Sequence, residues 1–160
     1  MKLRTMLLLC LVLFSGLALA KTKKAATAAA AVPPDYKAMM QAEYDLWSTM
    51  DPAKVGPMFA ADADLIFFDI TPLKYNGWSE YQKGVMKVFE PYSTMKCTVN
   101  DDVHGGRSGN MAWTAGTVNC HATKKDGGVD DMVLRTSEIY QKRGGKWLIV
   151  HEHASVPMKE

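Results

Sequence analysis

Two histidines stand two residues apart near the C-terminal end of the chain, in the stretch "GKWLIVHEHASVP" (145–157). The stretch is apolar and rich in β-forming residues, which predicts a strand, and side chains two residues apart on a strand lie on the same face. His151 and His153 are therefore expected on one face of that strand. Their face would also carry Trp147, Ile149 and Ser155, and the opposite face Leu148, Val150, Glu152, Ala154 and Val156.

Three hypotheses explain this pair of imidazoles. They could bind a metal ion together with Asp69, perform acid–base or hydrogen-bonding work on a ligand, or hydrogen bond to neighbouring side chains and fix the strand. Neither His104 nor His121 is placed in the sequence to complete a metal shell. No metal and no cofactor are predicted, and motifs for nucleotide or zinc-protease sites are absent from the sequence.

Asp69 ends the apolar run "LIFFD". A carboxylate against apolar walls is a useful base, so Asp69 is a candidate catalytic residue alongside His151 and His153. The alternative is that Asp69 only begins the turn before Thr71-Pro72, a common role for aspartate.

The strand that faces the histidines contributes further candidates. A two-residue turn at Gly144–Gly145 would place Glu138 beside His151, whereas a three-residue turn would place Arg135 beside His153. The sequence leaves both registers open. Arg135 is a candidate ligand-binding residue, because a guanidinium binds carboxylates or phosphates in a forked geometry, and the alternative is a solvated or ion-paired arginine.

Aromatic residues supply candidate walls for a ligand pocket. Those considered are Tyr44, Trp47, Trp113 and Trp147. The competing interpretation is that they are simply core.

The elements that must position these residues follow a clear order. Asp35 and Asp51-Pro52 are typical starts of helices, and a third helix is expected over 78–90, with Pro91 beyond its end. A strand is expected in "ADLIFFDI" (63–70), and the chain from 94 onward alternates strand and turn patterns. Helices first and strands later predict an α+β domain with the helices on one face of an antiparallel sheet.

Two cysteines, Cys97 and Cys120, remain outside the N-terminal leader. A tight turn at Ser108–Gly109 would pair residues whose numbers sum to 217, and 97 and 120 satisfy that sum. Directly opposed strand residues are close enough for a disulfide. A bulge among the glycines of this hairpin would instead leave two free thiols.

The first twenty residues have the pattern of a secretory signal peptide: basic Lys2 and Arg4, an apolar middle and the end Ala18-Leu19-Ala20. An uncleaved anchor is the alternative. Residues 21–34 form an Ala-rich segment expected to be a disordered linker, and 35–160 form one domain. We therefore expect a periplasmic or secreted protein without stable membrane insertion after cleavage.

The charge balance indicates no nucleic-acid partner. The full chain carries 19 basic and 17 acidic residues, and loss of Lys2 and Arg4 with the leader leaves 17 of each. No basic cluster interleaved with aromatics is present in the sequence.

Two stretches resemble the nuclear transport factor 2 superfamily, which includes ketosteroid isomerases and SnoaL-like polyketide cyclases. They are "MFAADADLIFFDITPLKYNGWSEYQKGV" (58–85) and "SEIYQKRGGKWLIVHEHASVP" (137–157). The second is also similar to the end of the association domain of calcium/calmodulin-dependent protein kinase II. The resemblance covers about 35–157 and implies a cone-shaped, curved antiparallel β-sheet packed on three N-terminal helices around a cavity.

The resemblance also bears on activity. Ketosteroid isomerases carry a catalytic carboxylate near the place of Asp69, but their paired acidic donors have no clear match here. Glu138 stands where the kinase association domain carries a basic residue. We expect an exported SnoaL-like domain that binds a small, partly apolar molecule; the alternatives are an isomerase or cyclase using acid–base chemistry and an oligomeric scaffold without ligand. The apolar row of Leu148, Val150, Ala154 and Val156 predicts a homodimer.

Overall fold

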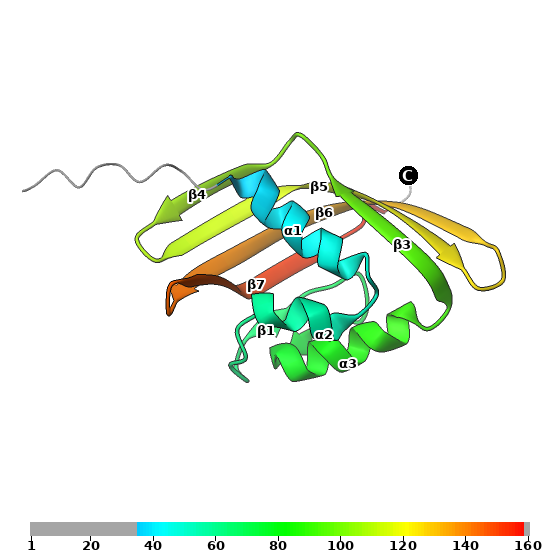
Figure 1. Cartoon of the computed structure of the whole chain (residues 1–160), viewed down its shortest axis with the longest axis horizontal. Coiled ribbons are helices and arrows are strands. Elements are labelled where there is room, and N and C mark those ends of the chain that lie inside the picture. The colour runs from blue at the N-terminus through cyan, green and yellow to red at the C-terminus, as the bar shows by residue number, and fades with distance from the viewer. Residues whose placement is uncertain (1–34, 159–160) are drawn as a thin grey trace, which may run out of the picture. The chain divides into compact units, whose positions relative to one another are not determined.

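The computed structural model describes residues 35–158, in which helices precede a long antiparallel sheet (Figure 1). The helices are α1 (Tyr36–Trp47), α2 (Pro52–Val55), the 3₁₀ turn η1 (Gly56–Met58) and α3 (Gly77–Phe89). The predicted signal peptide (1–20) and linker (21–34) lie outside the described residues.

The strands form two sheets of unequal size. A small one pairs β1 (Ile66–Phe67) with β2 (Tyr75–Asn76). The large one contains β3 (Tyr92–Val99), β4 (His104–Ser108), β5 (Met111–Lys124), β6 (Val129–Arg143) and β7 (Lys146–Ser155). Its order is β3-β5-β6-β7, and β4 also pairs with β5.

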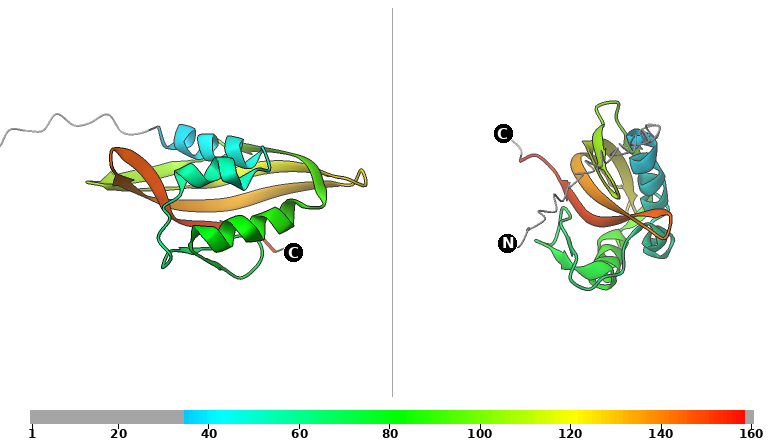
Figure 2. Two further views of the ribbon diagram at one scale, coloured as in Figure 1. Left: turned by 60° about the horizontal axis from the view of Figure 1, so that its bottom comes forward. Right: turned by 90° about the vertical axis from the view of Figure 1, so that its left-hand side faces the viewer.

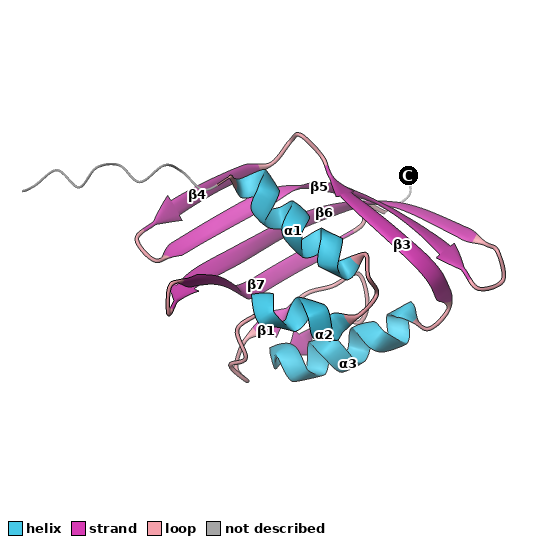
Figure 3. Cartoon of the chain, viewed as in Figure 1, coloured by secondary structure: helices cyan, strands magenta, loops and turns pink. Residues whose placement is uncertain are grey.

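The three helices lie on one face of this curved sheet, as Figure 2 shows from two directions and Figure 3 shows by element type. The predicted α+β cone-shaped fold is therefore confirmed. We call the sheet face under the helices the inner face and the opposite one the open face.

The predicted helix starts are also confirmed. The Asp35 carboxylate accepts a hydrogen bond from the Ala38 backbone amide at 2.9 Å, and Asp51 accepts one from Ala53 at 3.1 Å. Each carboxylate satisfies an amide that the first helical turn leaves without a partner. Pro52 follows at the first position of α2, where its missing N–H removes no helical bond.

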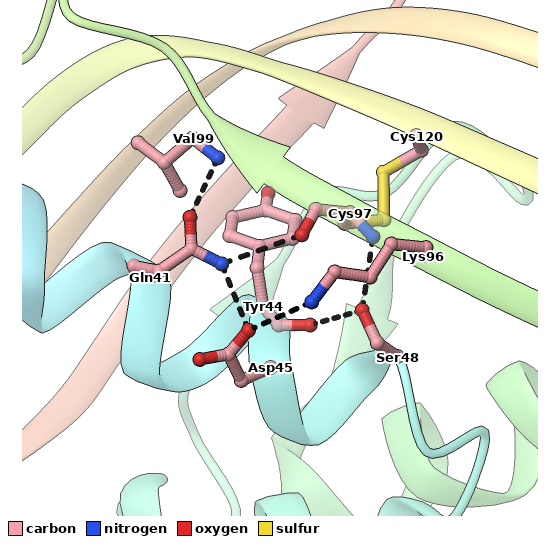
Figure 4. The surroundings of a disulfide bond; sticks show 8 residues. All are labelled: Gln41, Tyr44, Asp45, Ser48, Lys96, Cys97, Val99 and Cys120. Atoms are coloured by element: carbon pink, nitrogen blue, oxygen red, sulfur yellow. Dashed lines mark hydrogen bonds and ion pairs between the residues drawn. A yellow bond between two sulfur atoms is a disulfide. The ribbon is translucent and has the colours of Figure 1, made fainter.

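Side chains of α1 hold this helix against the edge strand β3 (Figure 4). Gln41 accepts from the Val99 amide at 2.8 Å and donates to the Cys97 carbonyl at 3.3 Å. The Cys97 amide donates to the Ser48 hydroxyl at 2.9 Å. These bonds satisfy the outer edge of β3 and set the rotation of α1, so that Tyr44 faces the sheet.

The disulfide between Cys97 and Cys120 is present, with the two Cα atoms 4.1 Å apart (Figure 4). The prediction is confirmed, although the turn differs from the expected one. Ser108 pairs with Met111, so the turn is Gly109–Asn110 and β4 pairs with β5 at a sum of 219. The connection between Val99 and His104 changes this sum by two, so that β3 pairs with β5 at the expected sum of 217. Because side chains alternate with a period of two, a register change of two residues keeps both cysteines on the same face.

The last hairpin combines a two-residue turn with a bulge. Gly144 and Gly145 have φ of 55° and 84°, as a tight hairpin turn requires, and Tyr140 pairs with Ile149. Beyond this point Ile139 pairs with His151, so Val150 is an extra residue. The bulge reverses the expected alternation: Ile149, Glu152 and Ala154 face inward, and both histidines face outward.

Two separate segments pack against the outer edge of β7 on either side of the bulge. The Ala60 amide donates to the Ile149 carbonyl, and the Phe68 amide donates to the Glu152 carbonyl, both at 2.9 Å. Phe68 forms a parallel bridge with His153. The segment after β1, which carries Asp69, is thereby joined to the sheet beside Glu152.

Candidate functional site

A cavity of about 210 Å³ lies between the helices and the inner face of the sheet. Its walls are mostly apolar and aromatic. They comprise Tyr44, Trp47, Asp69, Ile70, Thr71, Tyr81, Val85, Val88, Phe89, Tyr92, Met95, Cys97, Cys120, Ala122, Met132, Leu134, Glu152 and Ala154. An apolar cavity with a few polar groups is the usual form of a small-molecule site.

Asp69 enters the cavity because side chains alternate along the segment after β1. Phe67 is buried in the core, Phe68 points to the open face and Asp69 lines the cavity. One Asp69 carboxylate oxygen, Oδ1, accepts from the Ile70 amide at 2.7 Å. Burial raises the pKa of Asp69 to about 6, against the smaller lowering effect of this bond.

Glu152 supplies a second carboxyl group to the same cavity from β7. Its Oε2 accepts from the Tyr81 hydroxyl of α3 at 3.1 Å. Burial raises the pKa of Glu152 well above its usual range, and the charges of Asp69 and Glu138 raise it further. The cavity therefore holds two carboxyl groups that both resist ionisation.

Two more carboxyl groups lie buried behind Glu152. Glu138 is the strand partner of Glu152 on β6, and its Oε2 accepts from the Thr114 hydroxyl at 2.8 Å and from the Tyr140 hydroxyl. Glu43 of α1 accepts from the Trp47 indole N–H at 3.1 Å. Desolvation raises the pKa of both Glu43 and Glu138, and for Glu43 the charges of Glu138 and Glu152 add to it.

Four buried polar groups in this region face one another in two pairs. The Glu43 and Glu138 carboxyl groups hydrogen bond to each other through a shared proton, and the Tyr44 hydroxyl lies against the Thr136 hydroxyl. Such pairing is expected, because buried polar groups in folded proteins are hydrogen bonded.

The predicted inward orientation of His151 and His153 is wrong. Both imidazoles lie on the open face, where they pack edge-on against the Phe68 ring at 5.6 Å. His151 Nδ1 lies 2.7 Å from the Ile66 carbonyl oxygen, so this histidine holds β1 against β7. The cause is the Val150 bulge, which exchanges the two faces of the strand after Ile149.

Three other candidates also lie away from the cavity. Arg135 is exposed on the open face and donates to the Val156 carbonyl at 3.3 Å. Trp113 is 49% exposed on the same face. Trp147 lies near the turn end of β7, where its ring stacks under Arg107 and Lys142 at 5.2 and 5.8 Å.

Tyr44, Trp47 and Asp69 line the cavity, as expected for pocket residues. Sequence reasoning missed Tyr81 and Glu152 and assigned Glu152 to the opposite face. One available signal was the isolated glutamate in the apolar stretch "WLIVHEHASV", because a charged residue in such a run is buried only with partners. Glu43 gave a weaker signal, standing one turn before Trp47 on the helix face that packs on the sheet.

Among residues 35–158, no group of three or more His, Cys, Asp or Glu side chains is arranged to hold a metal ion. Within the same residues, no helix combines the length and the apolar character needed to span a membrane.

A layer of three helices over a curved antiparallel sheet, with a cavity between them, defines the nuclear transport factor 2-like fold. A family profile described as the SnoaL-like domain matches residues 37–159. The chain belongs to the SnoaL-like domain family. No curated protein matches it significantly.

Solved structures share the fold at low sequence identity. A nuclear transport factor 2-like superfamily protein from Salmonella enterica is 20% identical over 78% of this chain and 92% of its own, with a TM-score of 0.67. A proposed dehydratase of the same family from Streptomyces avermitilis is 14% identical over 77% and 95%, with a TM-score of 0.66. The association domain of Caenorhabditis elegans calcium/calmodulin-dependent protein kinase II is 16% identical over 74% and 91%, with a TM-score of 0.57.

Proposed function

We propose that this domain binds a small, mostly apolar molecule in the cavity between helices and sheet. The observation that carries the proposal is the cavity itself, with Asp69 and Glu152 set into apolar walls. A void of roughly 150 Å³ accommodates a benzene ring, so about 210 Å³ suits one ring with a short polar substituent. A scaffold without a ligand would be expected to fill such a space with its own side chains.

A cavity-filling variant tests this proposal. Ala122 lines the cavity from β5, and Ala122→Leu should occupy part of it, whereas Ala115→Leu adds the same atoms on the open face. Benzylamine and benzyl alcohol at millimolar concentration should raise the unfolding temperature of the wild type and of Ala115→Leu. The stabilisation should be lost in Ala122→Leu. The proposal would be contradicted if the probes stabilised both variants equally, or if neither probe stabilised the wild type.

A second candidate function is acid–base catalysis on the bound molecule, and the placement of Asp69 favours it. One oxygen of Asp69 has no hydrogen-bond partner among the described residues, and a pKa of about 6 suits a base at neutral pH. The resemblance to ketosteroid isomerases and the proposed dehydratase among the structural neighbours support this class of reaction. Asp69 would remove a proton from one carbon and return it to another, while the protonated Glu152 or Tyr81 would donate to the substrate oxygen.

This candidate is tested with a ring that fits the cavity. The domain should accelerate conversion of 3-cyclohexen-1-one into its conjugated isomer, followed by ultraviolet absorbance. Asp69→Asn should abolish turnover while retaining binding. If the two proteins show equal rates, Asp69 is not the base.

Export and self-association belong to the same proposal. The disulfide between Cys97 and Cys120 supports an oxidising location, periplasmic or secreted. The predicted dimer surface needs correction, because Ala154 faces the core and Leu148 and Val150 are half-buried, which leaves only Val156 of that row exposed. Apolar groups that the open face exposes include Trp113, Val133 and Ile139, and we propose that these three form a homodimer interface.

A further inference from the structure

Four elements of this domain place carboxyl groups in its interior. Its carboxyl groups come from α1 (Glu43), the segment after β1 (Asp69), β6 (Glu138) and β7 (Glu152). The hydroxyls that accompany them are those of Tyr44, Tyr81, Thr114, Thr136 and Tyr140. Among the described residues that line the cavity, none is basic.

A buried carboxylate is normally paired with a cation or fully hydrogen bonded. Here the hydrogen-bond donors to these groups are one indole N–H, three hydroxyls and the proton that Glu43 and Glu138 share, so no cation accompanies any of them among the described residues. Burial is the main cause of the raised pKa values of Glu43, Glu138 and Glu152, and no basic side chain among the described cavity-lining residues offsets it.

An independent observation at the cavity wall is the Asp69 carboxylate. Asp69 lines the cavity, and among the described residues only its Oδ1 is hydrogen bonded, to the Ile70 amide. Its second oxygen can accept a hydrogen bond from an N–H group. The rings of Trp47, Tyr81 and Phe89 also line the cavity, and aromatic faces attract cations.

We propose that the ligand is an organic cation: a primary or secondary amine on a small apolar body, with its ammonium group directed at Glu152 and Asp69. This inference rests on the proposed binding function and names its ligand class. The mostly apolar wall excludes a bare metal ion, since no three ligating side chains converge among residues 35–158. An ammonium supplies both the missing charge and up to three N–H donors.

Proton linkage follows from this arrangement. When an ammonium binds, the ionised forms of Asp69 and Glu152 become favoured, so binding releases protons to solvent. Because fewer protons remain to be released at higher pH, affinity for the amine should rise as pH increases from about 5 to 7, through the pKa of Asp69 near 6. Affinity for a neutral isostere should change little over this range.

The test compares benzylamine, benzyl alcohol and benzoate by isothermal titration calorimetry. At pH 7 benzylamine should bind at least about tenfold more tightly than benzyl alcohol, and benzoate should not bind. Phosphate and Tris differ in ionisation enthalpy, so proton release makes the measured binding enthalpy depend on the buffer. This dependence is expected for benzylamine and not for benzyl alcohol.

Three variants complete the design. Glu152→Gln keeps an oxygen for the Tyr81 hydroxyl but removes the charge, and it should reduce the preference for benzylamine to about threefold or less. Asp69→Asn is a second variant with the same expectation, should Glu152→Gln prove unstable. Asp131→Asn removes an exposed carboxylate from the open face and should change nothing.

Two results would overturn the inference. If benzyl alcohol binds as tightly as benzylamine, the cation inference fails while the binding function stands. If none of the three probes binds, the binding function and the inference fail together.

Discussion

At the residue scale, Asp69 and Glu152 define the site because two neighbouring chain segments present them on one face. Phe68 hydrogen bonds to the backbone of β7 on both sides of His153, which brings Asp69 beside Glu152. Each carboxyl group keeps one hydrogen bond to its surroundings, from Ile70 or from Tyr81. Asp69 could be identified from the sequence because it follows an apolar strand. The inward orientation of Glu152 could not, because it depends on the bulge at Val150.

The raised pKa of Asp69 predicts a specific pH dependence of stability. The unfolded chain releases this proton near pH 4 and the folded chain near pH 6, so the folded state holds more protons between these values. The contribution of Asp69 to the free energy of unfolding is therefore fully present below about pH 4 and decreases as pH rises to about 6. The loss amounts to at most about 1.4 kcal/mol per pH unit.

Asp69→Asn removes this titration. Urea unfolding at several pH values should show that the variant gains stability relative to the wild type as pH rises from 4 to 6. Asp64→Asn, at an exposed carboxylate outside any ion pair among the described residues, should run parallel to the wild type. A pH-independent difference between Asp69→Asn and the wild type would contradict the raised pKa.

At the scale of elements, the Val150 bulge decides which side chains of β7 face the cavity. Deletion of Val150 should leave Ile149, Glu152 and Ala154 facing inward, because the deleted residue is the one without a strand partner. We expect a folded protein destabilised by roughly 1–3 kcal/mol, through lost packing and a straighter strand. Circular dichroism and urea unfolding measure this.

Deletion of Asn119 is the matched control. Asn119 is exposed and lies in β5, which pairs continuously with β6, so its loss would turn half of β5 over. That variant should not fold. If both deletions abolish folding equally, Val150 is not the extra residue.

The same element marks the limit of sequence-based prediction. The helix caps at Asp35 and Asp51 and the order of helices and strands depend on local sequence patterns, so they could be predicted. The Cys97–Cys120 disulfide could be predicted because it requires only that both cysteines lie on the same face of paired strands. The position of a bulge depends on how Ala60 and Phe68, distant in sequence, pack against β7. Strict alternation therefore assigned His151 and His153 to the wrong face.

At the scale of the whole molecule, the open face carries exposed apolar groups that suit self-association. Ile139 and Val133 lie six residues apart on the same face of β6 and are 38% and 52% exposed, and Trp113 pairs with Ile139. We expect a dimer mass by light scattering at micromolar concentration. Ile139→Glu should give a monomer with unchanged secondary structure, whereas Lys83→Glu, on the exposed side of α3, should remain a dimer. A monomeric wild type would contradict the proposed interface.

The central claim is that the cavity is a ligand site, and methionine methyl groups report on it directly. Met95 and Met132 line the cavity, while Met86 and Met111 are 57% and 39% exposed elsewhere. The measurement is a titration of protein labelled with carbon-13 at its methionine methyls, using benzylamine and then benzyl alcohol. We predict saturable shifts at Met95 and Met132 with at least one probe and none at Met86 and Met111. Unchanged spectra with both probes, or equal shifts at all four methyls, would contradict the claim.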